Sequence, residues 1–355
     1  MHPNAHALCE VVRGWLVEPR WNALLRKIAK WVSLRYSGLK RFFGGTMSRA
    51  FVFPGQGSQA IGMGRALAEA YPASRAVFEA VDDALGEKLS ALIWDGAIED
   101  LTLTQNAQPA IMATSMAALA ALEAEGLGMA HVSFVAGHSL GEYSALCAVG
   151  SIGLADTARL LRTRGAAMQA AVPVGVGAMA AVLGLDYATV VAVAGEAAGG
   201  DVCQVANDND PAQVVISGHK AAVERACEIA KARGAKRALM LPVSAPFHCA
   251  LMEPAAQVMR DALAGVDVRA PAVPVVVNVR AEAVTDADEV RALLVAQVTG
   301  EVRWRASVQW LAQAGVTEFW EVGAGKALSG MIKRIEKETE QRNVGAPEDI
   351  TGLKA

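Results

Sequence analysis

The sequence predicts an α/β fold with a mainly parallel sheet and a smaller inserted unit, and three observations support this. Short apolar runs with the length of buried strands alternate with Ala-rich segments of helical spacing. A G-x-S-x-G pentapeptide, residues 137–141, lies between one such strand and one such helix. In the middle of the chain the order changes to strand, helix, strand, strand, helix, strand.

The larger unit begins with an expected strand at residues 50–53, followed by a Gly-rich turn and a segment of helical spacing through Phe78. A second strand is expected at 132–136, before the helix that Ser139 opens. Further strand-like runs are residues 273–278 and 318–322. Strands separated by helices pair in parallel, so these runs predict one parallel sheet. We assign residues 47–173 and 246–340 to this unit and 341–355 to a C-terminal tail.

The inserted unit is expected between residues 174 and 245. Its predicted elements are strand 177–183, helix 187–197, strands 202–206 and 214–217, helix 220–233 and strand 238–243. This βαββαβ order is typical of a ferredoxin-like domain.

Residues 1–46 differ from the rest of the chain because they hold eight Lys or Arg residues against two Glu residues. Trp21, Leu24, Ile28 and Trp31 fall near helical spacing, which would suit a basic amphipathic helix on a membrane or partner. Met47 directly precedes the first strand. We therefore favour the alternative that residues 1–46 precede a mis-assigned start and are absent from the native protein.

Composition excludes several classes of protein. Hydrophobic residues make up 53% of the chain and charged residues 19%, a balance that excludes general disorder. The formal net charge of −3 gives no basis for a nucleic-acid binder.

The five cysteines are scattered and form no CxxC pair, so they predict reduced thiols in a cytoplasmic protein and no metal site. Two long uncharged stretches, 101–122 and 165–185, contain polar residues, Pro or Gly. They predict buried globular segments, and no stable membrane association is expected.

The pentapeptide Gly137-His138-Ser139-Leu140-Gly141 predicts a nucleophilic serine. Glycines on both sides permit a tight turn from strand to helix, and the free N–H groups of the helix start face a developing negative charge. The same pentapeptide also occurs by chance, so the flanking strand and helix are what favour the functional interpretation.

A serine hydroxyl needs a base, and the chain has six histidines. His2 and His6 lie in the N-terminal extension, His131 and His219 lie beside expected strand ends, and His138 would point away from an elbow serine. His248 remains, in a Pro-containing loop after an expected strand. The residues alone leave open whether it is a base or a structural histidine.

Several separated motifs point to one family. They are FPGQGSQ (53–59), GHSLGEY (137–143), RTRG (162–165), NDNDPAQVVISG (207–218), APFHCALM (245–252) and EVGAGK (321–326). In order and spacing they resemble the malonyl-CoA:acyl-carrier-protein transacylases. The resemblance covers about residues 47–335 and implies a large α/β-hydrolase-like domain with a ferredoxin-like insertion.

The resemblance makes Ser139 the acyl carrier and His248 its base. In this family a main-chain carbonyl orients the base, and the matching position is Gln297; the sequence leaves an acid such as Asp156 or Asp201 as an alternative. The backbone N–H groups of Gln56 and Leu140 would form the oxyanion hole.

The resemblance also assigns substrate recognition. Arg164 would pair with an acyl carboxylate, whereas the residues alone favour a solvated helix arginine like Arg159 or Arg162. Phe247, just before the base, would leave little room for a 2-methyl branch.

Residues of the inserted unit have implied roles too. Asn207 and Asn209 match positions of a loop that lines the family's pocket, and Asp208 and Asp210 depart from the commoner tyrosine and serine there. Lys236 and Arg237 match a basic patch for the acidic carrier protein, although a solvated helix end would look the same.

The implied activity is malonyl transfer from malonyl-CoA to holo acyl carrier protein through a malonyl-serine, without a cofactor or metal, for fatty-acid elongation. Two alternatives within the transferases are the malonyl transferase of malonate decarboxylase and a polyketide acyltransferase. A serine esterase and a non-catalytic carrier-binding scaffold are rivals of other classes.

Overall fold

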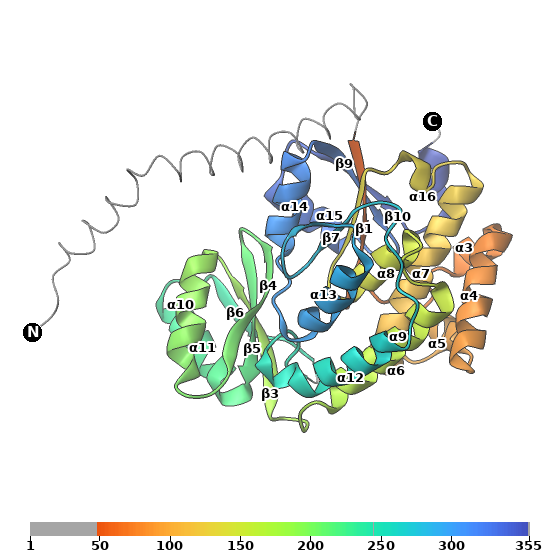
Figure 1. Ribbon diagram of the computed structural model, residues 1–355. Coiled ribbons are helices and arrows are strands. Elements are labelled where there is room, and N and C mark those ends of the chain that lie inside the picture. The colour runs from red at the N-terminus through yellow and green to blue at the C-terminus, as the bar shows by residue number, and fades with distance from the viewer. Residues whose placement is uncertain (1–47, 244, 354–355) are drawn as a thin grey trace, which may run out of the picture. The chain divides into compact units, whose positions relative to one another are not determined.

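Two sheets organise the part of the chain that the computed structural model describes, which is residues 48–243 and 245–353 (Figure 1). The basic extension of residues 1–46, and the hypothesis that it precedes a mis-assigned start, lie outside these residues.

The larger sheet has six strands in the order β10-β9-β1-β2-β7-β8, and all neighbours are parallel except β7 and β8. The strands are β1 (Ser48–Phe53), β2 (Phe134–Gly137), β7 (Val275–Val277), β8 (Glu282–Val284), β9 (Val316–Val322) and β10 (Glu340–Val344). The predicted α/β class with a mainly parallel sheet is confirmed.

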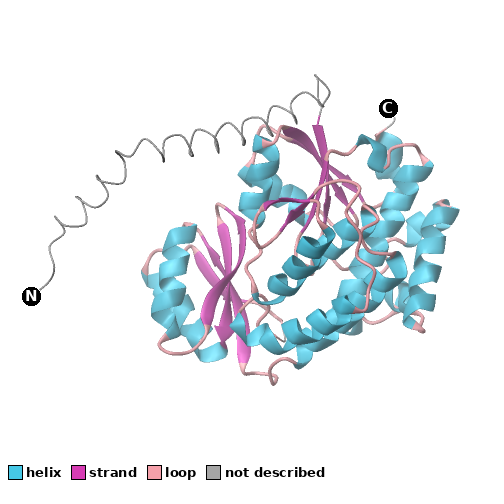
Figure 2. Ribbon diagram, in the orientation of Figure 1, coloured by secondary structure: helices cyan, strands magenta, loops and turns pink. Residues whose placement is uncertain are grey.

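Helices cover both faces of this sheet (Figure 2). Because side chains alternate along a strand, Ala50 and Val52 pack toward α14 (Trp304–Gln313) and α15 (Ala327–Ile335) on one face. Phe51 and Phe53 join the larger core on the other face. The helices of that core are α3 (Arg65–Ala70), α4 (Pro72–Leu85), α5 (Leu89–Asp95), α6 (Ile98–Thr102), α7 (Thr104–Ala124), α8 (Leu140–Ala148), α9 (Leu154–Ala170), α12 (Glu253–Ala264), α13 (Ala287–Thr299) and α16 (Pro347–Gly352).

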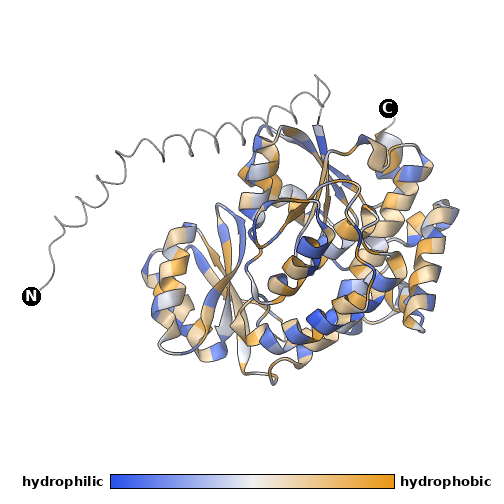
Figure 3. Ribbon diagram, in the orientation of Figure 1, coloured by the Kyte–Doolittle hydropathy of each residue, from blue (hydrophilic) through white to orange (hydrophobic). Residues whose placement is uncertain are grey.

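The outer helices are amphipathic, as α12 illustrates. Its buried residues Ala255, Met259 and Leu263 are four positions apart, so they share one face of the helix. Figure 3 shows hydrophilic residues on the same helix beside the hydrophobic ones.

The smaller sheet has the order β4-β5-β3-β6, and all neighbours are antiparallel. Its elements are β3 (Gly177–Leu183), α10 (Tyr187–Ala198), β4 (Cys203–Asp210), β5 (Gln213–His219), α11 (Lys220–Ala232) and β6 (Arg237–Met240). This confirms the ferredoxin-like βαββαβ order. Both helices pack on the sheet face that lies away from the rest of the described chain (Figure 1). We call these elements the small subdomain and the remaining ones the large subdomain.

Two segments differ from the predictions. Strand β4 continues to Asp210, where the family resemblance implied a loop, because Asn207, Asp208 and Asp210 pair with β5 and Asn207 also bridges to Val302. The segment assigned to a C-terminal tail contains the edge strand β10 and the helix α16. The polar sequence Glu340-Gln341-Arg342-Asn343 has no apolar alternation, since an edge strand needs none on its solvent side.

Among residues 48–243 and 245–353, every helix is too short or too polar to span a lipid bilayer.

Candidate active site

The turn between β2 and α8 presents Ser139 at the carboxyl edge of the large sheet. Ser139 has φ 54° and ψ −110°, a backbone conformation that non-glycine residues rarely adopt. Its flanking glycines allow the close packing around it. A Cβ on Gly137 would lie 1.9 Å from the carbonyl carbon of Gly141, and a Cβ on Gly141 would lie 2.2 Å from the carbonyl oxygen of Phe53.

We expect Gly141→Ala to destabilise the protein by about 3 kcal/mol, because the added methyl overlaps backbone atoms that have no room to move. Gly195→Ala is the matched control, since Gly195 lies in α10 with open space around its Cα. In that control the free energy of unfolding should rise by about 0.5–1 kcal/mol, because alanine has the higher helix propensity. Urea unfolding measures both, and equal stabilities of the two variants would contradict the close packing at the elbow.

Ser139 and His248 form a hydrogen-bonded pair. Ser139 Oγ lies 2.7 Å from His248 Nε2. His248 Nδ1 lies 2.9 Å from the main-chain oxygen of Gln297 and 3.1 Å from that of Gly300. Carbonyl oxygens only accept, so Nδ1 carries the ring proton and Nε2 is free to accept the serine proton. The alternative orienters Asp156 and Asp201 pair with arginines elsewhere, Arg159 and Arg225.

Burial, together with the positive charge of Arg164, lowers the pKa of His248 from 6.5 to about 3. The imidazole is therefore neutral at physiological pH, which is the form that accepts a proton.

Arg164 on α9 is buried, with 1% of its surface exposed, and points at the same serine. Its Nη1 donates to Gln108 Oε1 at 2.8 Å, and its Nη2 donates to Gln297 Oε1 at 2.9 Å and to Ser139 Oγ at 3.2 Å. No carboxylate within the described residues lies at ion-pair distance from this guanidinium, and its Nε has no hydrogen-bond partner there. A buried guanidinium that donates to neutral amide and hydroxyl oxygens can accept an anionic ligand.

A cavity of about 330 Å³ joins these groups. Its lining from the large subdomain includes Gln56, Ser139, Leu140, Arg164, Phe247 and His248. Its lining from the small subdomain includes Met179 and Asn207, and the following residues 241–243 complete the wall. Leu140 is the first residue of α8, so its N–H has no acceptor within the helix and is available to an oxyanion.

Asn209, Lys236 and Arg237 lie outside this cavity, and Gln297 contacts its residues without lining it. His138 Nε2 donates to Asn209 Oδ1 at 2.9 Å, so Asn209 orients the His138 ring next to Ser139 and does not line the acyl cavity. Lys236 and Arg237 are exposed at the start of β6, which is an edge strand of the small sheet.

Asn278, which follows β7 and is fully buried, is a site residue that the sequence motifs do not predict. Its Oδ1 accepts from the backbone N of Ser139 at 2.8 Å, and its Nδ2 donates to the oxygen of Gly137 at 2.7 Å. Asn278 therefore fixes the backbone on both sides of His138 in the strained turn through two hydrogen bonds. The sequence does contain one signal for this role: Asn278 is a polar residue directly after a buried parallel strand. The carboxyl ends of parallel strands meet at one edge of the sheet, where sites form.

Glu142, also missed, lies in the first turn of α8 and accepts from the backbone N of Asn278 at 2.7 Å. Its other carboxylate oxygen has no partner among the described residues. Burial raises the pKa of Glu142 from 4.5 to about 7.

We expect the wild-type protein to lose stability, relative to Glu142→Gln, as the pH rises from about 4.5 to about 7. The unfolded carboxyl ionises near pH 4.5, whereas the folded one keeps its proton up to about 7, so the folded state binds more protons in this window. Across this range the free energy of unfolding should fall by roughly 3 kcal/mol relative to the variant. Urea unfolding of both proteins across this range measures it, and parallel pH profiles would contradict it.

The described residues contain no group of three or more His, Cys, Asp or Glu side chains that could hold a metal ion. What the arrangement can perform is acyl transfer, with an activated serine, N–H donors for an oxyanion and a cationic group beside the reacting atoms.

Comparisons with known proteins agree with this chemistry. The acyl transferase domain family matches residues 50–346. The malonyl CoA-acyl carrier protein transacylase of Escherichia coli (strain K12) is 50% identical over 286 residues, which cover 81% of this chain and 92% of that protein.

Solved structures are similar as well. The acyl-carrier-protein-S-malonyltransferase of Bartonella henselae is 54% identical, with a TM-score of 0.85 over 86% of this chain and 98% of that one. A malonyl-transacylase in complex with its type II PKS acyl-carrier protein is 42% identical, with a TM-score of 0.83 over 86% of this chain and 98% of that one. The chain therefore belongs to the acyl transferase domain family.

Proposed function

We propose that this protein transfers the malonyl group of malonyl-CoA to the phosphopantetheine thiol of an acyl carrier protein, through a malonyl ester on Ser139. The observation that carries the proposal is the buried Arg164 guanidinium beside the Ser139–His248 pair. Family membership and the names of the relatives support it.

In the first half-reaction, Ser139 Oγ attacks the thioester carbonyl while His248 Nε2 takes the hydroxyl proton. The backbone N–H groups of Gln56 and Leu140 donate to the resulting oxyanion. The C–S bond then breaks, the CoA sulfur receives the proton from His248, and the malonyl ester remains on Ser139.

In the second half-reaction, the thiol of the carrier gives its proton to His248 and its sulfur attacks the ester carbonyl. The C–O bond to Ser139 breaks, and Oγ takes the proton back. Malonyl-carrier leaves, and the enzyme is restored. No step of this cycle calls for a cofactor.

Arg164 selects the acyl group because a guanidinium binds a planar carboxylate with two parallel hydrogen bonds. Gln108 and Gln297 hold it in place with their side-chain oxygens. Phe247 lines the same cavity, and its bulk favours malonyl over a 2-methyl-branched analogue.

Lys236 and Arg237 suit the acidic carrier protein, since both are exposed, Arg237 at the start of the edge strand β6 and Lys236 just before it. Residues 241–243, a few positions along the chain, line the cavity. A carrier docked on this pair would therefore lie near the opening through which its thiol must enter.

The proposed setting is the cytoplasm, where CoA thioesters are available and thiols stay reduced, in keeping with the free cysteines Cys147, Cys203, Cys227 and Cys249. Fatty-acid elongation is the proposed pathway. The relative solved with a type II PKS carrier makes polyketide synthesis the second candidate.

The test measures transfer from malonyl-, methylmalonyl- and acetyl-CoA to holo carrier proteins of both pathways. We expect malonyl-carrier to be the main product. Equal transfer of acetyl groups, or release of free malonate without transfer, would contradict the proposal, and the preferred carrier separates the two pathways.

A further inference from the structure

The end of strand β4 has two different faces. Asn207 lines the acyl cavity, Asn209 contacts His138 of the large subdomain, and Asp208 and Asp210 form ion pairs with arginines of the large subdomain. Asn207 and Asp208 pair with successive residues of β5, so their side chains point to opposite sides of the sheet, and the pairing becomes irregular between Asp208 and Asp210. One short segment therefore both lines the site and attaches the small subdomain.

Two ion pairs contribute to the attachment. Arg305 on α14 donates from Nε to the two carboxylate oxygens of Asp208 at 3.0 and 2.9 Å, and its Nη2 lies 2.9 Å from Oδ2. Arg334 on α15 donates from Nε to Asp210 Oδ2 at 2.9 Å. The side chain of Asp208 is 7% exposed and that of Asp210 is 0% exposed, so these charges depend on their partners.

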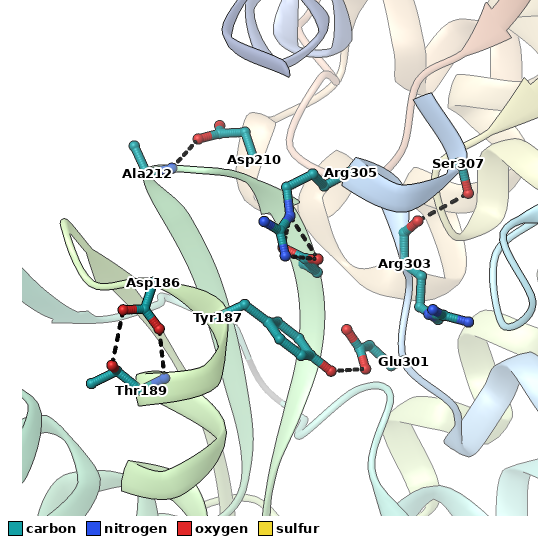
Figure 4. Close-up of polar contacts among 10 residues, drawn as sticks. Asp186, Tyr187, Thr189, Asp210, Ala212, Glu301, Arg303, Arg305 and Ser307 are labelled. Carbon is teal, nitrogen blue, oxygen red and sulfur yellow. Dashed lines mark hydrogen bonds and ion pairs between the residues drawn. The ribbon is translucent and has the colours of Figure 1, made fainter. Parts of the chain in front are cut away.

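Further contacts between the subdomains surround the first pair (Figure 4). Tyr187 on α10 donates from its hydroxyl to Glu301 Oε2 at 3.0 Å, and the Arg305 guanidinium lies 5.6 Å from the centre of the Tyr187 ring. In the main chain, Val302 N donates to Ala206 O at 2.8 Å, and Asp208 N donates to Val302 O at 3.0 Å.

This attachment lies next to the carbonyls that orient the base. Gly300 and Gln297, whose oxygens contact His248 Nδ1, precede the bonded residue Val302 by two and five positions. A shift of β4 would thus displace both the Asn207 side of the cavity and the segment behind His248.

We propose that Asp208 and Arg305 are positioning residues for acyl transfer. Their ion pair, assisted by that of Asp210 and Arg334, holds β4 against the large subdomain and thereby keeps the acyl cavity closed to water. The inference rests on the proposed function, because it concerns the fate of the malonyl ester on Ser139.

Loss of the pair should favour hydrolysis over transfer. In hydrolysis, water gives a proton to His248 and adds its oxygen to the ester carbonyl. The C–O bond to Ser139 then breaks, Oγ takes the proton back, and malonate leaves. A looser cavity admits water more easily, whereas the carrier thiol is delivered by docking and gains nothing from the extra space.

The experiment isolates the malonyl-enzyme and measures its rate of hydrolysis and its rate of transfer to holo carrier protein. Asp208→Asn removes the charge at constant shape, and Arg305→Lys keeps the charge but loses the two-pronged contact. We expect the hydrolysis-to-transfer ratio to rise at least about tenfold in both, the change that about 1.4 kcal/mol produces. Asp201→Asn, which breaks the Asp201–Arg225 pair within the small subdomain, is the control and should keep the wild-type ratio.

The ratio does not depend on how much of a variant is folded, so general destabilisation leaves it unchanged. If Asp208→Asn fails to fold, Arg305→Lys decides, because it retains the charge on a side chain that is 28% exposed. If the folded variants keep the wild-type ratio of hydrolysis to transfer, the inferred role of the ion pair is overturned and the proposed function still stands. Failure of the wild-type protein to transfer malonyl groups at all would overturn the proposed function as well.

Discussion

Arg164→Ala should lower kcat/KM for malonyl-CoA by about 10³-fold, equivalent to about 4 kcal/mol of transition-state stabilisation. The malonyl carboxylate would lose its counter-charge inside a cavity where water cannot replace it. Acetyl-CoA has no carboxylate, so its kcat/KM should fall far less, and the preference for malonyl over acetyl should collapse.

Initial rates with both thioesters measure this preference. Arg159→Ala is the matched control, because Arg159 lies on the same helix but is exposed and pairs with Asp156. It should retain the wild-type ratio. An Arg164→Ala enzyme that still prefers malonyl-CoA by the wild-type factor would show that the carboxylate is bound elsewhere.

Ser139→Ala should reduce malonyl transfer by about 10⁴-fold or more, because the hydroxyl that forms the covalent intermediate is gone. His248→Ala should lose a similar factor. The double variant should be little worse than either single one, since the two groups act as a unit.

Steady-state transfer assays with all three variants measure these losses. Ser144→Ala provides the control, because Ser144 is buried on the same helix as the elbow and its hydroxyl has no hydrogen-bond partner among the described residues. Activity within tenfold of wild type in Ser139→Ala would contradict a covalent role.

The sequence was sufficient for the features that local chemistry determines. The G-x-S-x-G pentapeptide could be assigned to a turn because only glycine tolerates the contacts made at Gly137 and Gly141. The ferredoxin-like order of the small subdomain followed from hydrophobic patterning. The roles proposed for His248 and Arg164, by contrast, needed the family resemblance, since a lone loop histidine or helix arginine has no distinctive local signal.

Contacts between residues far apart in the chain could not be predicted. Asn278 holds the backbone of Ser139 across 139 positions, and Asp208 meets Arg305 across 97 positions. Nothing in the local sequence indicates either pairing, because it depends on how the two sheets pack. The strand β10 likewise has no local signal, because its polar residues form a strand only by pairing with β9 at the edge of the sheet.

The most direct test of the account is mass spectrometry of the protein after brief incubation with malonyl-CoA and acid quenching. Proteolysis should place one malonyl group on the peptide that contains Ser139, and addition of holo carrier protein before quenching should remove it and produce malonyl-carrier. An unmodified Ser139 peptide under conditions of active transfer, or a malonyl group on another residue, would contradict the mechanism.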